Sequence, residues 1–320
     1  MSRVVPLVTL LCALLGTGAR GQARASDITL STPSPVVATM FDRSGRFVVG
    51  VCEDHKLRLW DVATTRLLRT VDIAGREVAM TAMSDDGEWM VMGDYHGDIT
   101  VWNTATGQVQ SEQHLDRYLT AAAFSHDGRR LALAPGSPVR VYDLLANRVL
   151  YELDPTLGSN AVVFSRDDGL IASADGDGIR VYDARMGKLV SKNADFLAEP
   201  LAVEFARDAK SVIAAGGDRA VLSIDVATGK TLRRMAKTAE PIFYLEVSPD
   251  GRQLAVVTQR GDNPALSAPV IVAELPSLQK VMEWMSPTGV LLPGGAAWSR
   301  DGHFVVATAA SGELHLRRVR

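Results

Sequence analysis

Cysteine is scarce in this chain of 320 residues, which contains only Cys12 and Cys52. Cys12 lies in an N-terminal segment that we expect to be removed, and this would leave Cys52 as the single thiol of the mature protein. A single cysteine excludes an internal disulfide, and a lone thiol in an oxidising compartment is usually buried. The stability of the fold must therefore come from the packing of side chains.

Long hydrophobic runs are also missing. The apolar stretch at residues 4–15 is interrupted by Pro6 and is shorter than the roughly 20 residues of a membrane-spanning helix. It follows Arg3 and precedes Ala23-Arg24-Ala25, an order typical of a secretory signal peptide. We therefore predict that residues 1–25 are a signal peptide, cleaved before Ser26. The mature protein would be periplasmic or secreted, with no membrane span.

Positive charge is not in excess, because 34 basic residues face 37 acidic ones and the net charge is −3. Three of the arginines, Arg3, Arg20 and Arg24, lie in the predicted signal peptide, which has no acidic residue. The remainder of the chain is therefore more acidic still. A surface that binds nucleic acid needs clustered positive charge, so nucleic acid is not the expected partner.

Motifs for catalysis or for cofactors are absent. The chain has no Cys-x-x-Cys-His, no phosphate-binding glycine loop and no Gly-x-Ser-x-Gly. The histidines occupy unrelated positions: His55, His96, His114, His126, His303 and His315. A metal pair at His55 and His96 is conceivable, but solvated loop histidines explain both better. We predict no catalytic residue, no metal and no cofactor, and not an enzyme.

The chain is instead built from a repeat. A turn of the type Ser-x-Asp-Gly recurs about every 41 residues, and an interval of roughly 40–45 residues is typical of a four-stranded propeller blade. Its glycine falls at Gly45, Gly87, Gly128, Gly169, Gly251 and Gly302, with Lys210 in the fifth place. One repeat, residues 78–118, contains four short strand patterns separated by turn signals, which predicts an antiparallel meander.

Two further positions follow the same period. An Asp or Asn closes the predicted third strand and can accept backbone N–H groups in the next turn, at Asp61, Asn103, Asp143, Asp183 and Asp225. Four residues later, a positive φ is expected at Thr65, Gly107, Asn147, Gly187 and Gly229. Large residues on the first strand are expected to pack between blades: Phe41, Met83, Phe124, Phe164, Phe205, Val247 and Trp298.

These repeats resemble a known family. The segments Leu57-Arg58-Leu59-Trp60-Asp61 and Ile99-Thr100-Val101-Trp102-Asn103 resemble the Trp-Asp strand of WD-repeat β-propellers. Ser125-His126-Asp127-Gly128 and Ser248-Pro249-Asp250-Gly251 look like the first turn of exported bacterial, TolB-like members. The resemblance implies a propeller fold and says little about function.

The chain also departs from the WD-repeat pattern. The Gly-His pair that opens a typical WD repeat is missing, and the tight-turn Asp survives only at Asp54 and Asp218. Hydrophobic packing is therefore expected to hold the blades.

We predict an all-β, seven-bladed β-propeller with four-stranded antiparallel blades in residues 26–320. The expected blades are 36–77, 78–118, 119–159, 160–199, 200–240, 241–289, and 290–320 together with 27–32. The last repeat lacks a fourth strand, whereas residues 27–31 alternate apolar and polar side chains. Pairing of residues 28–31 with residues 313–318 would close the ring and remove two exposed edges.

The sixth repeat is about ten residues longer than the others, with the excess at residues 259–268 and 286–295. Both connections should emerge on one face, where long loops often carry binding residues, although an insertion can also be merely tolerated. Arg260, Asp262, Asn263 and Leu266 would form a charged rim around an apolar residue. We interpret this patch as a candidate partner-binding site.

The favoured function is an exported, non-enzymatic scaffold that binds a protein or peptide partner of the cell envelope on one propeller face. The alternative is a secreted propeller enzyme, lactonase-like or lyase-like, with its site at the central mouth. Such an enzyme needs carboxylates or histidines there, and the inner-strand positions are mostly Ala, Val and Leu. The sequence does not indicate the oligomeric state.

Overall fold

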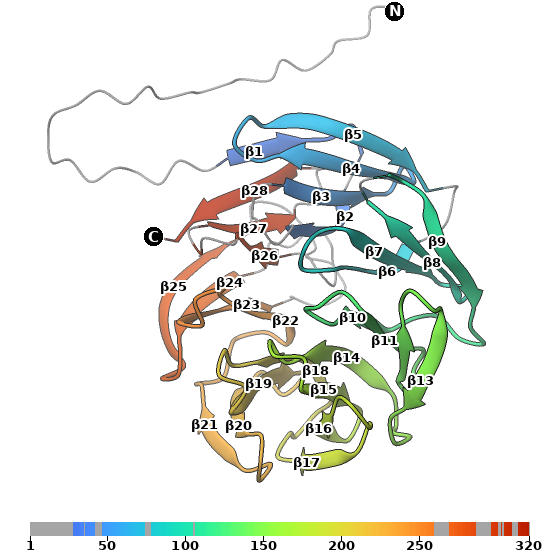
Figure 1. Ribbon diagram of the computed structural model, residues 1–320. Helices are drawn as coiled ribbons and strands as arrows, with labels where there is room; N and C mark the ends of the chain where they lie inside the picture. Colours follow the sequence, from blue (N-terminus) through green and yellow to red (C-terminus); the bar gives the residue numbers. More distant parts are fainter. Residues whose placement is uncertain are drawn as a thin grey trace, which may run out of the picture.

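The computed structural model describes residues 28–34, 36–41, 47–73, 78–104, 106–258, 269–285, 296–299, 302, 304–308 and 313–319. Every regular element in these ranges is a β-strand, and none of them forms a helix that could cross a membrane. The strands pair in four-stranded antiparallel sheets that surround a central axis (Figure 1). The predicted all-β propeller of four-stranded antiparallel blades is confirmed.

We number the sheets as blades in chain order of their innermost strands. Blade 1 contains β2 (Val36–Phe41), β3 (Phe47–Cys52), β4 (Lys56–Asp61) and β5 (Arg66–Asp72). Blade 2 contains β6 (Val78–Met83), β7 (Trp89–Asp94), β8 (Asp98–Asn103) and β9 (Val109–His114). Blade 3 contains β10 (Ala121–Phe124), β11 (Arg130–Ala134), β12 (Arg140–Asp143) and β13 (Arg148–Glu152).

The other sheets are built in the same way. Blade 4 contains β14 (Ser159–Phe164), β15 (Leu170–Asp175), β16 (Gly178–Asp183) and β17 (Leu189–Asn193). Blade 5 contains β18 (Pro200–Phe205), β19 (Ser211–Gly216), β20 (Val221–Asp225) and β21 (Thr231–Arg234). Blade 6 contains β22 (Ile242–Val247), β23 (Gln253–Thr258), β24 (Pro269–Glu274) and β25 (Gln279–Met285). Blade 7 contains β26 (Ala296–Trp298), β27 (Phe304–Thr308), β28 (Glu313–Arg318) and β1 (Ile28–Ser31).

The two ends of the described chain meet in blade 7. β1 pairs antiparallel with β28, with Ile28 opposite Leu316 and Ser31 opposite Glu313, as the sequence predicted. The innermost strands contact one another in chain order from β2 to β26, and β26 contacts β2 (Figure 1). The β1–β28 pairing therefore closes a ring and supplies the outer strand that the C-terminal repeat lacks.

The core is divided into layers between neighbouring blades. Phe205 and Val212 of blade 5, for example, belong to one buried cluster with Ala172 and Val181 of blade 4. The large first-strand residues predicted as core are buried at Phe124, Phe164, Phe205 and Trp298 and partly buried at Met83 and Val247. The side chain of Phe41 lies outside the described part of the structure. Cys52 is also buried, and burial raises the pKa of its thiol.

The turn that follows each third strand has the predicted geometry. A side-chain oxygen of Asp61, Asn103, Asp143, Asp183 or Asp225 accepts the backbone N–H three residues later. The expected positive φ is found at Thr65, Gly107, Asn147, Gly187 and Gly229. These turns are local structures, in which the polar side chain replaces a backbone acceptor.

The alignment of the Ser-x-Asp-Gly turn was wrong in two repeats. The positive φ that its last position requires belongs to Asp168 (58°) and Ala209 (53°), and to neither Gly169 nor Lys210. Asp tolerates this left-handed conformation because its short side chain can hydrogen-bond locally, whereas Ala has no such compensation. Glycine fills the position, with positive φ, at Gly87, Gly128, Gly251 and Gly302. Gly45 lies outside the described residues.

Blade 4 corrects the expectation that hydrophobic packing alone holds the blades. The carboxylate of Asp175 is buried and accepts hydrogen bonds from Ser159 Oγ (2.5 Å) and Ser173 Oγ (2.8 Å). Arg180 Nη1 lies 2.9 Å from the same carboxylate, so its charge is paired. The sequence did not reveal this network because Asp175 ends the second strand, one place before the expected turn position.

Candidate functional site

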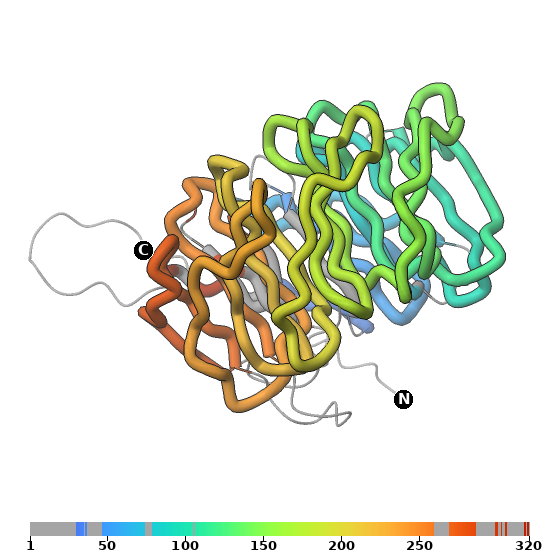
Figure 2. Tube along the Cα trace, turned by 90° about the horizontal axis from the view of Figure 1, so that it is seen from below, coloured from blue at the N-terminus to red at the C-terminus, as the bar shows by residue number. Residues whose placement is uncertain are grey.

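The strand connections divide the propeller into two faces (Figure 2). One face carries the Ser-x-Asp-Gly turns and the turns between the third and outer strands, and we call it the turn face. The loop face carries the connections between second and third strands and those that lead to the next blade. In an antiparallel meander these two sets must lie at opposite ends of the strands.

Large apolar side chains are exposed in successive connections of the loop face. Tyr118 follows β9, Leu157 follows β13 and Leu197 follows β17, and they are 50%, 81% and 80% exposed. Tyr95, in the loop between β7 and β8, is also exposed, and its ring centroid lies 6.1 Å from that of Tyr118. We call these four residues the apolar row. Contiguous exposed apolar groups are typical of an interaction site, and Tyr95 and Tyr118 form such a contiguous pair.

The backbone beneath the apolar row is fixed by contacts with the neighbouring loops. Leu115 N–H donates to Gly97 O at 2.8 Å, and Gly176 N–H donates to Gly158 O at 2.9 Å. Gly97 has a φ of 94°, and a Cβ atom there would lie 2.3 Å from Leu115 O. Only glycine allows this close approach. The apolar side chains are therefore carried on well-supported connections.

The predicted partner-binding residues Arg260, Asp262, Asn263 and Leu266 lie outside the described residues, as does the second long connection at 286–295. The strands that flank them are described. β23 ends at Thr258 and β24 begins at Pro269, while β25 ends at Met285 and β26 begins at Ala296. By the order of the strands, these four strand ends lie on the loop face, as the apolar row does.

The polar loop residues that could have suggested a metal have structural partners. Asp94 Oδ1 accepts the N–H groups of His96 and Asp98, each at 2.9 Å. Asp177 binds Arg180 and Lys192, and these cations hold the pKa of its carboxyl well below the usual range. His55 and His96 lie in the corresponding loops of adjacent blades. No group of three or more metal-ligating side chains occurs in the described ranges.

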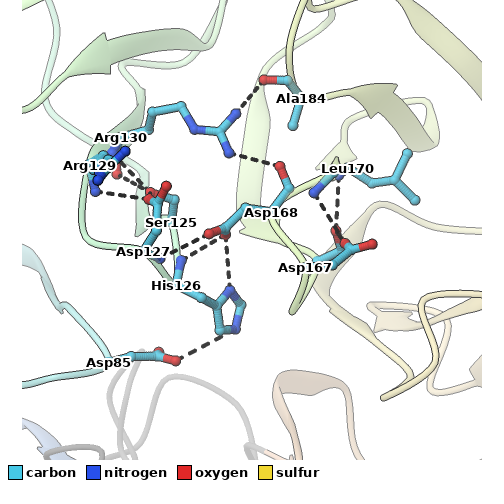
Figure 3. Close-up of polar contacts among 12 residues, drawn as sticks. Asp85, Ser125, His126, Asp127, Arg129, Arg130, Asp167, Asp168, Leu170 and Ala184 are labelled. Atoms are coloured by element: carbon cyan, nitrogen blue, oxygen red, sulfur yellow. Dashed lines mark hydrogen bonds and ion pairs between the residues drawn. The ribbon is translucent and has the colours of Figure 1, made fainter.

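On the turn face, His126 connects three blades (Figure 3). Its Nε2 lies 3.7 Å from Asp85 Oδ2 of blade 2, and its Nδ1 lies 3.3 Å from Asp168 Oδ1 of blade 4. Asp168 also accepts the N–H groups of His126 (2.7 Å) and Asp127 (2.9 Å). The side chain at the second turn position therefore bridges to the neighbouring turns.

An open depression of about 550 Å³ lies beside this bridge, between blades 3 and 4. It is lined by Asp127, Arg129, Arg130, Asp143, Asp167, Asp168, Gly169 and Arg185. Its carboxylates accept hydrogen bonds from the turns, and Arg130 donates to Asp168 O at 2.8 Å and lies over the Phe164 ring. Charges of both signs are present, and their contacts connect the two blades. The depression is thus explained by blade packing.

Two inner-strand carboxylates were missed from the sequence. Glu204 of β18 and Glu246 of β22 each precede a large first-strand residue, where other blades have Ala82, Ala123 and Val163. Burial, with a contribution from Asp85, raises the pKa of Glu204 to about 8. Burial and the charge of Glu204 also raise the pKa of Glu246 well above its usual range.

Glu246 has a partner in the next blade, because its Oε2 accepts the Trp298 N–H at 2.9 Å. The expectation of apolar inner strands is therefore incomplete. These carboxylates could have been found in the sequence, because the two glutamates occupy equivalent positions of consecutive repeats.

The blade architecture thus defines the class of protein as a β-propeller, and comparison with known proteins relates it to the WD-repeat type. Residues 28–61 match the family model described as WD domain, G-beta repeat. Over 104 residues the chain is 25% identical to the U3 small nucleolar RNA-associated protein 21 homolog of Schizosaccharomyces pombe. Over 98 residues it is 26% identical to the WD repeat-containing protein SL1-17 of Schistosoma mansoni.

These similarities are partial. They cover 32% and 30% of this chain, and they span only 12% and 33% of the two relatives. Together with the fold they support a WD-repeat β-propeller, and WD repeats suggest a protein-interaction scaffold. Neither relative's name describes an enzyme.

Proposed function

We propose that the protein is a non-enzymatic scaffold that docks a protein or peptide partner on its loop face. The observation that carries this proposal is the apolar row, in which Leu157 and Leu197 are about four-fifths exposed. Tyrosine is a frequent source of binding energy at the centre of an interface, and exposed leucines contribute when a partner removes their apolar surface from water. Tyr95 and Tyr118 add two aromatic rings to the same face.

The long connections of blade 6 extend this surface in our proposal. Arg260, Asp262, Asn263 and Leu266 would contribute a charged rim beside the apolar row. The support is positional, because the described strand ends that bracket residues 259–268 and 286–295 lie on the loop face. Long loops on a rigid scaffold are common places for binding residues.

We further infer a seven-bladed ring in an exported, TolB-like bacterial protein of the periplasm or the extracellular space. The sheet order, with the β1–β28 pairing, supports the ring, and the order of charged, apolar and small residues at 1–25 supports export. The partner would then belong to the cell envelope. N-terminal sequencing of the protein from an envelope fraction tests this: Ser26 at the N-terminus agrees with export, and a retained Met1 contradicts it.

The docking proposal is tested by placing charges on the loop face. We expect the double variant Leu157→Asp/Leu197→Asp to fold normally, because both side chains are exposed, and to capture its partner about tenfold less. Leu145→Asp is the matched control, since Leu145 is 67% exposed in the turn between β12 and β13 on the opposite face. Quantitative mass spectrometry of proteins co-purified from envelope extract measures partner capture by the double variant and by the control. Equal capture by the double variant and wild type would refute loop-face docking.

The alternative, a lactonase-like or lyase-like enzyme, draws on one observation: the raised pKa of Glu204 and Glu246 near the turn-face end of the inner strands. A carboxylic acid that keeps its proton near neutral pH can act as a general acid. Assays on lactone and polyuronate substrates with Glu204→Gln and Glu246→Gln test it. Turnover that either variant abolishes would favour the enzyme over the scaffold.

A further inference from the structure

Two arginines of consecutive blades converge on one carbonyl oxygen at the turn face. Arg166 Nη1 of blade 4 lies 3.2 Å from Pro249 O of blade 6, and Arg207 Nη1 of blade 5 lies 2.9 Å from the same atom. Arg166, Arg207 and Pro249 hold the same second position in the equivalent turns between first and second strands of three consecutive blades. The ring therefore brings together two guanidinium groups that are one repeat apart in sequence.

Packing fixes the position of these groups. A Cβ atom on Gly251 would lie 2.6 Å from Cβ and 3.0 Å from Cδ of Arg207, so the aliphatic part of Arg207 packs on the blade 6 turn. Arg166 reaches past the blade 5 turn to contact Pro249. Arg207 is thus held by its aliphatic contact and its hydrogen bond, and Arg166 by its long-range hydrogen bond. Both side chains remain exposed.

The two positive charges lack a counter-charge in the described part of the chain. No ion pair of Arg166 or Arg207 occurs there, and each carbonyl contact uses one of the five N–H donors of a guanidinium. The carboxylates of the same turns are hydrogen-bonded within them: Asp167 accepts Ser165 Oγ at 2.6 Å, and Asp208 accepts Lys210 N–H at 3.0 Å. Two like charges that share one acceptor repel each other, and an anion between them removes that repulsion.

We propose that Arg166 and Arg207 form a binding site for an oxyanion, and specifically for a phosphate group. One guanidinium is sufficient to bind both oxygens of a carboxylate, whereas two converging guanidiniums match the three terminal oxygens of a phosphate monoester and its charge of about −2. The site lies on the turn face, opposite the apolar row, so it is independent of the docking proposal.

The experiment uses inorganic phosphate as the probe. The purified full chain is titrated with phosphate by isothermal calorimetry at constant ionic strength, with acetate titrated in parallel. We expect saturable binding of phosphate to the wild type and a loss of affinity of about tenfold or more in Arg166→Gln and in Arg207→Gln. Arg69→Gln is the matched control, because Arg69 is an exposed arginine that donates to a turn carbonyl of the next blade, Thr104 O.

Folding is monitored separately, since the arginine contacts also connect blades. Arg166→Lys and Arg207→Lys retain the charge, and we expect them to bind phosphate more weakly than wild type and more tightly than the Gln variants. No saturable binding by the wild type would overturn the proposal, whatever the stability of the variants. So would an equal loss in Arg69→Gln, and acetate binding as tight as phosphate binding would overturn the assignment to phosphate.

Discussion

Glu204 carries a proton at a pH where an ordinary glutamate has lost it. Its pKa of about 8 results mainly from burial on β18, because removing a carboxylate from water disfavours the charged form. The neighbouring charge of Asp85 acts in the same direction, and Glu204 in turn contributes to the raised pKa of Glu246. Two carboxyl groups with raised pKa therefore lie near the turn-face end of the inner strands.

The sign of the pH effect follows from proton binding. Between the ordinary pKa of 4.5 and about 8, the folded state holds more protons at Glu204 than the unfolded state, so stability falls as pH rises through this range. We expect Glu204→Gln to flatten this decline and to be more stable than wild type at pH 8 by about 1–2 kcal/mol, a value that allows for partial solvent exposure. Urea unfolding at pH 5 and pH 8 measures the effect. A steeper decline in the variant would contradict the assignment.

At the residue scale, local chemistry was predictable and contacts between blades were not. Thr65 and Asn147 were expected to have positive φ because their turns are complete within a few residues. Asp167-Asp168-Gly169 allows two alignments, and only the backbone shows that Asp168 takes the left-handed place. Arg166 meets Pro249 across two repeats, a juxtaposition that depends on the ring and has no local sequence signal.

At the scale of elements, blade 4 depends on the buried Asp175. Asp175→Ala would remove the partner of two buried serine hydroxyls and of Arg180, and we expect a loss of about 3–4 kcal/mol in the free energy of unfolding. The matched control is Asp143→Ala, since Asp143 is partly exposed and its side chain accepts a backbone N–H in its own turn, that of Ala146. The control should lose about 1 kcal/mol. Urea denaturation that gives equal losses would show that the network contributes little.

β1 is the other element whose contribution can be isolated. Deletion of residues 26–32 leaves β28 as an exposed edge and removes Leu30, which is 2% exposed. We expect stability to fall by several kcal/mol and the truncated protein to associate. Thermal unfolding and size-exclusion chromatography measure this. An unchanged melting temperature in a monomer would show that β1 does not stabilise the ring.

On the scale of the whole molecule, the repeat period predicted the propeller but not the distribution of its surfaces. Packing between blades needs the same residue types in every repeat, so the period is visible in sequence. The apolar row is different, because Tyr118, Leu157 and Leu197 lie in equivalent connections of unlike sequence, which the repeat pattern does not mark. Arg166 and Arg207 occur on the opposite face. The molecule therefore offers two surfaces of different chemistry.

Site-specific photocrosslinking in living cells tests the central claim, that a partner docks on the loop face, most directly. A photoreactive phenylalanine analogue is introduced at position 157 or 197 on the loop face, or at position 145 on the turn face, all of which hold exposed leucines. Docking on the loop face predicts a light-dependent crosslinked product at positions 157 and 197 and none at position 145. Crosslinking at position 145 alone would contradict it.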